Sequence, residues 1–308
     1  MALELSKQDI GIIVSLAEYR VMTIRHLEVL YSGNKRVLRR KLKNFAGQDL
    51  IQVGSGVFAK KRGRPENIFS LGHEGFELLK VKGILNTDIP YERVKAITAH
   101  SLSHMLLIND FRIQLVQTEK IVPNLSVTFL SPNSPFLPRF NDDKPIVYER
   151  FTLDKAGTNW VNYTPDGVFI LRCTESKKTL LFFLEVDMAT ESLASEKRYK
   201  GSIEGKIANY QLSYQLTRYK RYESFFKCRL RGFRLLFLTN DFARLSRLSK
   251  LIVQMPPSDF INITDQDSLL TKGLWAPIWY KGGRVEQQLV SILGSKTPEN
   301  SPCPDELL

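Results

Sequence analysis

The 308-residue sequence lacks the features that mark membrane, secreted or zinc-binding proteins. Its apolar runs are no longer than a strand, whereas a membrane-spanning helix needs about 20 apolar residues in succession. Met1 is not followed by the basic segment and apolar stretch of a secretory signal. The three cysteines are an odd number, at spacings that fit neither a disulfide framework nor a zinc site. We therefore expect a cytoplasmic protein with reduced thiols and no membrane partner.

Acidic residues are the minority among the charged side chains. The chain has 44 Lys and Arg against 32 Asp and Glu, a formal net charge of +12. Residues 33–64 contain ten basic residues and one acid, and residues 195–234 contain eleven basic residues and three acids. Clustered positive charge is typical of proteins that bind an anionic polymer. The two clusters predict two surfaces that contact nucleic acid, with double-stranded DNA as the expected partner and RNA as the alternative.

The first 85 residues have the pattern of three helices and a β-hairpin. Apolar residues recur at helical spacing over residues 10–17, and further helices are expected over 23–30 and 35–46. Strands are expected over 50–53 and 67–71, followed by a helix from His73. In the third helix, Leu38, Leu42 and Phe45 would lie on one face and the basic residues on the other.

Helix, helix, turn, basic helix and hairpin resemble a winged helix-turn-helix domain. The resemblance implies that the third helix enters the major groove of DNA and that the hairpin loop, or wing, contacts the backbone or the minor groove. Contact with another protein is the alternative use of such a domain. The residues expected to bind DNA are Lys35, Arg36, Arg39, Arg40, Lys43, Lys60, Lys61, Arg62 and Arg64.

The tetrapeptide Arg62-Gly63-Arg64-Pro65 allows two interpretations. It is similar to the core of an AT-hook, in which arginine enters a narrow A·T-rich minor groove because of its enhanced negative potential. A wing turn that needs Gly and Pro for its geometry explains the same residues equally well.

Acidic side chains stand at the ends of two expected strands in the second half of the chain. Thr164-Pro165-Asp166 precedes a strand expected over 167–172, and Glu185 and Asp187 end a strand expected over 179–186. Because side chains alternate along a strand, Glu185 and Asp187 point to one face, and a hairpin can bring Asp166 beside them. Three converging carboxylates favour Mg²⁺ or Mn²⁺, which promote phosphodiester hydrolysis. Solvated acids at strand ends are the alternative explanation.

The other elements expected in this region alternate between helix and strand. Helices are expected over residues 93–118, 193–222 and 242–253, and strands over 126–130, 232–238 and 276–280. Residues 86–90 are expected to form a linker, and a long irregular loop is expected before residue 150. The order predicts an α/β layer arrangement with a parallel crossover. Pro, Ser, Asn and acids predominate from residue 294 onward, so a disordered tail is expected over 294–308.

The order of elements and the positions of the acids resemble the PD-(D/E)XK nuclease superfamily. Pro165-Asp166 matches the first motif and Glu185 the second, which implies that both carboxylates bind the metal. The superfamily has Lys at the third position, where this chain has Asp187. Since a carboxylate cannot replace a cation, the resemblance implies that a lysine arrives from the following helix or that hydrolysis is lost. The candidate lysines, expected with the three acids to be catalytic, are Lys197, Lys200 and Lys206.

The segment FFLEVDMATES, residues 182–192, indicates a more specific resemblance than the nuclease superfamily. Together with the helical domain before it and residues 104–110 between them, it is similar to the replication-relaxation family of mobile-element proteins. The resemblance implies a nucleoid- or plasmid-associated protein that handles plasmid, transposon or prophage DNA. A replication, transposition or mobilisation protein is then an expected partner, and a homodimer is expected because winged helices often bind DNA as dimers.

The expected architecture is a two-domain protein. A winged helix-turn-helix domain occupies residues 1–85, and a PD-(D/E)XK restriction-endonuclease-like α/β domain occupies residues 91–290. Two functions stay open. One is a DNA endonuclease or nickase that depends on Mg²⁺ or Mn²⁺, and the other is a non-catalytic DNA-binding accessory factor or regulator with a degenerate nuclease fold.

Overall fold

The computed structural model describes residues 4–31, 34–55, 66–140, 142–152, 160–193 and 201–294. The chain divides into two compact units, residues 1–113 with 133–139 and residues 114–132 with 140–308. The division falls within the helix α5 (Ala99–Ile121) rather than in the expected linker at 86–90. Residues 86–90 do not separate the units, because Leu85, Ile89 and Val94 are buried in the core of the first unit.

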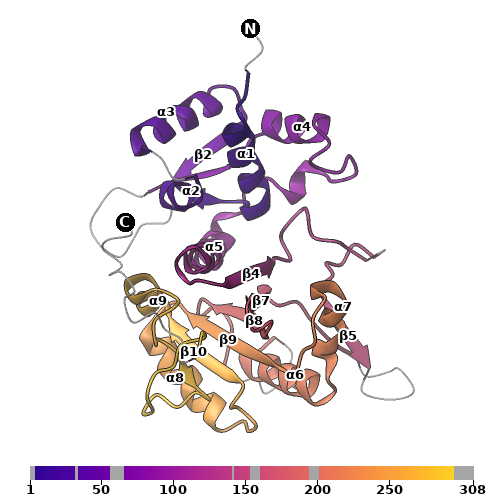
Figure 1. Ribbon diagram of the computed structural model, residues 1–308, viewed down its shortest axis with the longest axis vertical. Helices are drawn as coiled ribbons and strands as arrows, with labels where there is room; N and C mark the ends of the chain where they lie inside the picture. The colour runs from indigo at the N-terminus through magenta and orange to yellow at the C-terminus, as the bar shows by residue number, and fades with distance from the viewer. Residues whose placement is uncertain are drawn as a thin grey trace. The chain divides into compact units, whose positions relative to one another are not determined.

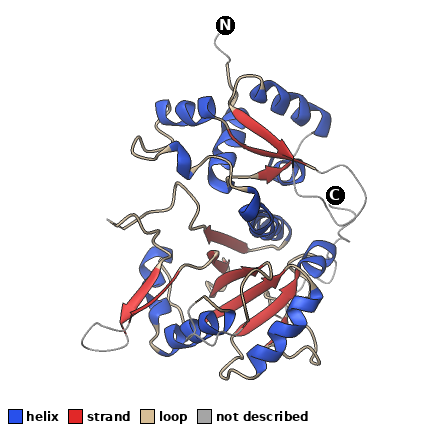
Figure 2. Ribbon diagram, turned by 180° about the vertical axis from the view of Figure 1, so that it is seen from behind, coloured by secondary structure: helices blue, strands red, loops and turns tan. Residues whose placement is uncertain are grey.

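The first unit combines helices with a three-stranded antiparallel sheet (Figure 2). The strand order is β1-β3-β2, and Ile51 of β2 pairs with Leu71 of β3. The helices and strands expected from the sequence over residues 10–81 are confirmed. The elements are α1 (Lys7–Tyr19), β1 (Met22–Thr23), α2 (Ile24–Tyr31), α3 (Lys35–Ala46), β2 (Ile51–Ser55), β3 (Asn67–Leu71) and α4 (His73–Val81). A 3-10 turn at Tyr91–Arg93 and then α5 follow α4.

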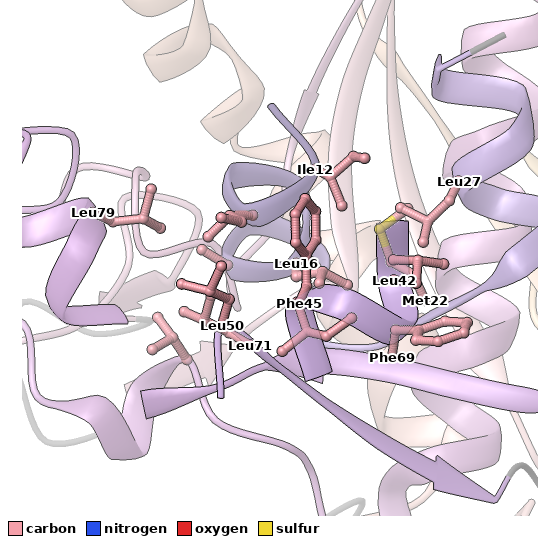
Figure 3. Close-up of a cluster of buried hydrophobic side chains, with 14 of the residues drawn as sticks. Ile12, Leu16, Met22, Leu27, Leu42, Phe45, Leu50, Phe69, Leu71 and Leu79 are labelled. Carbon is pink, nitrogen blue, oxygen red and sulfur yellow. The ribbon is translucent and has the colours of Figure 1, made fainter. Parts of the chain in front are cut away.

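The apolar faces of these elements form one core, shown in Figure 3. Ile12 and Leu16 of α1, Leu42 and Phe45 of α3, and Phe69 of β3 are all buried in it. The sequence had predicted this inward face of α3 from its spacing. Because the apolar side of α3 is used by the core, its basic side is left at the surface.

The second unit is built on a six-stranded mixed sheet with the strand order β11-β10-β9-β8-β7-β4 (Figure 1). Strands β4, β7 and β8 pair antiparallel, β8, β9 and β10 pair parallel, and β11 is antiparallel to β10. The expected layer arrangement with a parallel crossover is confirmed. The elements are β4 (Leu125–Leu130), β5 (Glu149–Thr152), β6 (Trp160–Tyr163), β7 (Gly167–Cys173), β8 (Thr179–Asp187), α6 (Ile203–Gln215), α7 (Tyr222–Phe226), β9 (Phe233–Thr239), α8 (Phe242–Val253), β10 (Ile261–Asp265), α9 (Gln266–Lys272) and β11 (Tyr280–Lys281).

Two expectations for the second unit are wrong. The helix predicted over 193–222 is interrupted, because α6 ends at Gln215 and Thr217 has a left-handed backbone with φ of 52°. The strand predicted over 276–280 is only the short β11, whereas the buried strand β10 was missed because its sequence INITD is rich in polar residues. The irregular region expected before residue 150 is confirmed, since the described residues between β4 and β5 form no helix or strand, and β5 begins only at Glu149 and pairs with β6.

Two further expectations concern a disordered C-terminal tail and the lack of a membrane-spanning segment. The predicted tail, residues 294–308, lies outside the described residues except for Gly294. None of the helices in the described residues is both long enough and apolar enough to cross a membrane.

Candidate functional site

Strands β7 and β8 bring the carboxylates of Asp166 and Glu185 together. In their antiparallel register Gly167 faces Leu184, so Asp166, immediately before β7, lies beside the end of β8. Asp166 is fixed there because its Oδ2 accepts a 2.8 Å hydrogen bond from the backbone N–H of Val186. The two acids of the sequence motif therefore meet at one end of the hairpin.

Glu185 is 4% exposed, and both of its carboxylate oxygens accept hydrogen bonds. The hydroxyl of Tyr210 donates to Oε1 at 2.6 Å, and Nζ of Lys206 donates to Oε2 at 3.2 Å. Lys206 and Tyr210 lie one turn apart on α6, so one face of that helix supplies both donors. Of the three candidate lysines, Lys206 reaches the carboxylates, whereas Lys197 and Lys200 lie outside the described residues.

Burial and neighbouring charges shift the pKa values of Glu185 and Lys206. Burial raises the pKa of Glu185 to about 7; Lys206 opposes this increase and the neighbouring Asp166 carboxylate adds to it. Burial alone would lower the pKa of Lys206, but the carboxylates of Glu185, Glu191 and Asp166 outweigh it and raise the pKa above its usual value. Lys206 is therefore a stable ammonium group beside a carboxyl group that ionises near neutral pH.

Asp187 does not join this pair of carboxylates. Its Oδ2 accepts a 2.6 Å hydrogen bond from Nε of Arg244, and its Oδ1 accepts bonds from Nη2 of Arg244 at 3.2 Å and from the N–H of Ala189 at 2.9 Å. Among the described residues, no three or more His, Cys, Asp or Glu side chains are grouped so that they could hold a metal ion. The expected cluster of three carboxylates is therefore not found in this part of the chain; the carboxylate of the third acid, Asp187, is held by Arg244 of α8.

Sequence reasoning missed three side chains of this site. Tyr210 had one usable signal, because it follows Lys206 by four residues and a helix places both on one face. Glu191 holds Lys206 through a 3.0 Å hydrogen bond to its Oε1. Arg244 holds Asp187 from a helix 57 residues away in the sequence. The roles of Glu191 and Arg244 depend on the approach of separate segments, which spacing along the chain does not reveal.

The basic residues of α3 form a second candidate site, in the first unit. Asn34 caps the start of the helix by accepting a hydrogen bond from the N–H of Arg36. Lys41, which was not predicted to bind DNA, is held by Asp9 of α1 at 2.7 Å. Lys35 pairs with Glu28 at 3.1 Å but remains half exposed. The α3 residues that were predicted to bind DNA are all exposed: Lys35, Arg36, Arg39, Arg40 and Lys43.

A hollow of about 620 Å³ lies beside α3 within the first unit. Lys35, Arg39 and Lys43, at every fourth position of the helix, line it together with apolar side chains that include Val53 of β2 and Phe69 of β3. The predicted wing residues cannot be placed against it. Outside the described residues lie Lys60, Lys61, Arg62 and Arg64, together with the rest of the AT-hook-like segment.

Comparison with known proteins places the chain in a family. The family model described as replication-relaxation matches residues 13–227. No curated protein matches the chain, and no solved structure matches it. The matched region includes α3 as well as Asp166, Glu185 and Lys206, and it covers more than half of the sequence. The chain therefore belongs to the replication-relaxation family.

Proposed function

We propose that this protein is a DNA-binding protein of a mobile element that carries a winged helix-turn-helix in its first unit and a metal-dependent DNA endonuclease or nickase site in its second. Membership of the replication-relaxation family supports a role in the replication or mobilisation of such elements. The observation that carries the nuclease assignment is the contact between Lys206 and Glu185 beside Asp166. Lys206 would supply, from α6, the cation that the PD-(D/E)XK motif has at its third position and that this chain lacks at Asp187.

The order of elements supports the same assignment. A helix, three antiparallel strands, a helix and a parallel strand occur in this order as α5, β4, β7, β8, α6 and β9, with the separate hairpin β5–β6 inserted after β4 and the short α7 after α6. This is the arrangement that the resemblance to PD-(D/E)XK nucleases implied. In the first unit, three helices followed by a hairpin likewise agree with a winged helix-turn-helix.

The donor chemistry of Asp166 and Glu185 fits Mg²⁺ or Mn²⁺. Both residues are carboxylates, which hard divalent cations prefer as ligands. The pKa of Glu185 is raised by burial, and Asp166 adds to the increase, so a bound cation would favour the ionised form of Glu185. When bound, the cation would activate a water molecule and stabilise the leaving oxygen of a phosphodiester. Asp187 does not fit that role, because its carboxylate is held by Arg244.

Lys206 and Tyr210 would have different tasks at this site. The side chain of Lys206 is 31% exposed, so its ammonium can face a bound phosphate and stabilise the negative charge that develops there. Tyr210 is fully buried and would hold Glu185 in one orientation. Burial raises the pKa of the Tyr210 hydroxyl well above its usual value, so the hydroxyl remains a donor to Glu185.

The exposed cations of α3 would bind duplex DNA. Arg39 and Arg40 are free to reach phosphates or base edges, since the apolar face of α3 is already buried in the core. Each phosphate contact releases counterions, so this binding should weaken steeply with salt. The expected homodimer, the protein partner and the nucleoid or plasmid association remain predictions from the sequence.

A nicking assay tests the nuclease assignment. Purified protein is incubated with supercoiled DNA in Mg²⁺, Mn²⁺ or EDTA, together with Asp166→Ala, Glu185→Ala and Lys206→Ala. We expect metal-dependent nicking that each substitution lowers by about a hundredfold or more, the scale on which charge-stabilising groups act. Glu175→Ala, which removes an exposed carboxylate from the turn between β7 and β8, is the matched control and should cut normally.

The ion pair between Asp187 and Arg244 favours a second function. It occupies a carboxylate that the expected metal site would have used, as it would in a non-catalytic accessory factor or regulator that retains the fold alone. Wild-type protein would then leave DNA intact in Mg²⁺ and Mn²⁺ while still retarding it in a gel. Asp166→Ala and Glu185→Ala would change neither result.

A further inference from the structure

Asp187 occupies the position at which the related nuclease motif has a lysine. It is connected to Lys206 by successive contacts through Arg244 and Glu191. We infer that Asp187, Arg244 and Glu191 are positioning residues, which together hold the ammonium group of Lys206 beside Glu185. The catalytic purpose of this arrangement rests on the proposed function, whereas the chain of contacts can be tested without it.

The first step is the ion pair between β8 and α8. Arg244 and Asp187 are 4% and 3% exposed, and the guanidinium group meets both oxygens of the carboxylate, at 2.6 and 3.2 Å. Such two-point pairs fix orientation as well as distance. Arg244 lies in the first turn of α8, which Asp241 caps by accepting a hydrogen bond from the backbone N–H of Arg244. The backbone of Arg244 is therefore held by the helix cap, and its guanidinium group is held by the carboxylate of Asp187.

The second step links this pair to the segment after β8. Nη2 of Arg244 donates a 2.7 Å hydrogen bond to the backbone carbonyl of Glu191. The same segment is turned sharply at Ala189, whose φ is 60°, and the N–H of Ala189 donates to Oδ1 of Asp187. A left-handed backbone at a non-glycine residue is costly and persists only where surrounding contacts impose it. Asp187 and Arg244 thus hold the backbone that carries Glu191.

The third step reaches Lys206. Oε1 of Glu191 accepts a 3.0 Å hydrogen bond from Nζ of Lys206, which also donates to Glu185. The segment is tied to the start of α6 as well, because Ser192 and Leu193 accept backbone hydrogen bonds from the N–H groups of Ile203 and Glu204, at 3.1 and 2.9 Å. Residues 189–193 therefore position both the Glu191 carboxylate, which holds Lys206, and the start of α6, which carries Lys206.

These contacts explain why an acid occupies the position of the motif lysine. A lysine at position 187 would face Arg244 and leave two like charges buried without compensation, which is strongly unfavourable. With Asp187 in place, Arg244 is neutralised and the cation for Glu185 comes from α6. The loss of the lysine at position 187 is thus accompanied by the placement of Lys206, from α6, beside Glu185.

The accessibility of Lys206 tests this inference directly. Native protein is acetylated briefly with an amine-reactive ester, and the modified fraction of Lys206 is measured by mass spectrometry. We expect the fraction to rise several-fold in Arg244→Met and in Glu191→Ala, because Lys206 is no longer held. Glu191→Gln should stay near wild type, since its amide oxygen can still accept the hydrogen bond. Arg284→Met, which removes the exposed pair with Asp259, is the matched control and should change nothing.

A folded Arg244→Met with unchanged modification of Lys206 would overturn the inference. Circular dichroism establishes whether that variant folds; if it does not, Glu191→Ala decides, because the side chain of Glu191 is 38% exposed and its loss is easily tolerated. If wild-type protein nicks DNA, Arg244→Met should lower kcat and leave KM for DNA unchanged. A wild type that nicks nothing while Lys206 still responds to these substitutions would reject the proposed function but uphold the positioning role.

Discussion

Two buried glutamates of the second unit have similar hydrogen-bond partners but different surroundings. Glu149 and Glu185 each accept one hydrogen bond from a cation and one from a tyrosine hydroxyl. The cation of Glu149 is Arg221, which also donates to the backbone carbonyls of Ile146 and Tyr148 and is thereby locked in place. The cation of Glu185 is a partly exposed lysine beside a second acid. Glu149 therefore belongs to the framework, whereas Glu185 is the carboxylate that we propose as a metal ligand.

The pH dependence of stability gives a prediction for Glu185. Its pKa of about 7 in the folded protein lies above the ordinary 4.5, so wild type loses stability as the pH rises through the range between these values. Glutamine does not ionise, so Glu185→Gln lacks this loss. Relative to wild type, the free energy of unfolding of the variant should increase by about 2 kcal/mol between about pH 5 and pH 8.

Urea unfolding at both pH values measures this difference. Glu175→Gln, which changes an exposed carboxylate of the same hairpin, should show no such trend. A difference between Glu185→Gln and wild type that stays constant with pH would contradict the assignment of an unfavourably placed charge to Glu185.

At the scale of elements, the first unit depends on a close approach between α4 and the chain entering β2. Gly75 of α4 is buried, and an added Cβ would meet the carbonyl oxygen of Leu50, which is backbone and cannot turn aside. Glycine normally weakens a helix relative to alanine. The glycine at position 75 shows that the close contact between α4 and Leu50 outweighs the helix propensity that alanine would add.

Gly75→Ala should therefore destabilise the protein, by about 1–3 kcal/mol, although alanine favours helices. The matched control is Gly47→Ala at the end of α3, where φ is −64° and the added Cβ would lie 3.5 Å from the nearest backbone oxygen. That substitution should be neutral or slightly stabilising. Thermal unfolding compares the two variants, and equal midpoints would show that α4 tolerates a side chain at this contact.

At the scale of the whole molecule, the two units carry two different chemistries. The first presents an exposed row of cations on α3, suited to phosphates. In the second, the described residues bring Asp166, Glu185 and Lys206 together, which is the basis of the proposed hydrolytic site. The described residues of each proposed site belong to a single unit, so we predict that binding and cutting of DNA are separable by mutation.

Arg39→Ala and Arg40→Ala should weaken DNA binding and lower the slope of log affinity against log salt by about one for each lost phosphate contact. In a nicking assay these variants should raise KM for DNA and leave kcat unchanged. Asp166→Ala should instead lower kcat and leave DNA binding, measured by gel shift, unchanged. Lys82→Ala, which removes an exposed cation just after α4, is the matched control. Parallel losses of binding and cutting in all variants would show that the two functions are not separate.

Sequence by itself determined the elements whose signal is local. The buried face of α3, the pairing of β7 with β8 and the meeting of Asp166 with Glu185 all follow from helical or strand periodicity, which neighbouring residues encode. Tertiary structure alone decided that Lys206 reaches Glu185, that Arg244 takes Asp187 out of the site, and that the polar strand β10 is buried. These outcomes depend on which distant side chains meet in a desolvated interior, where each buried charge must find a partner, and spacing along the chain does not specify that partner.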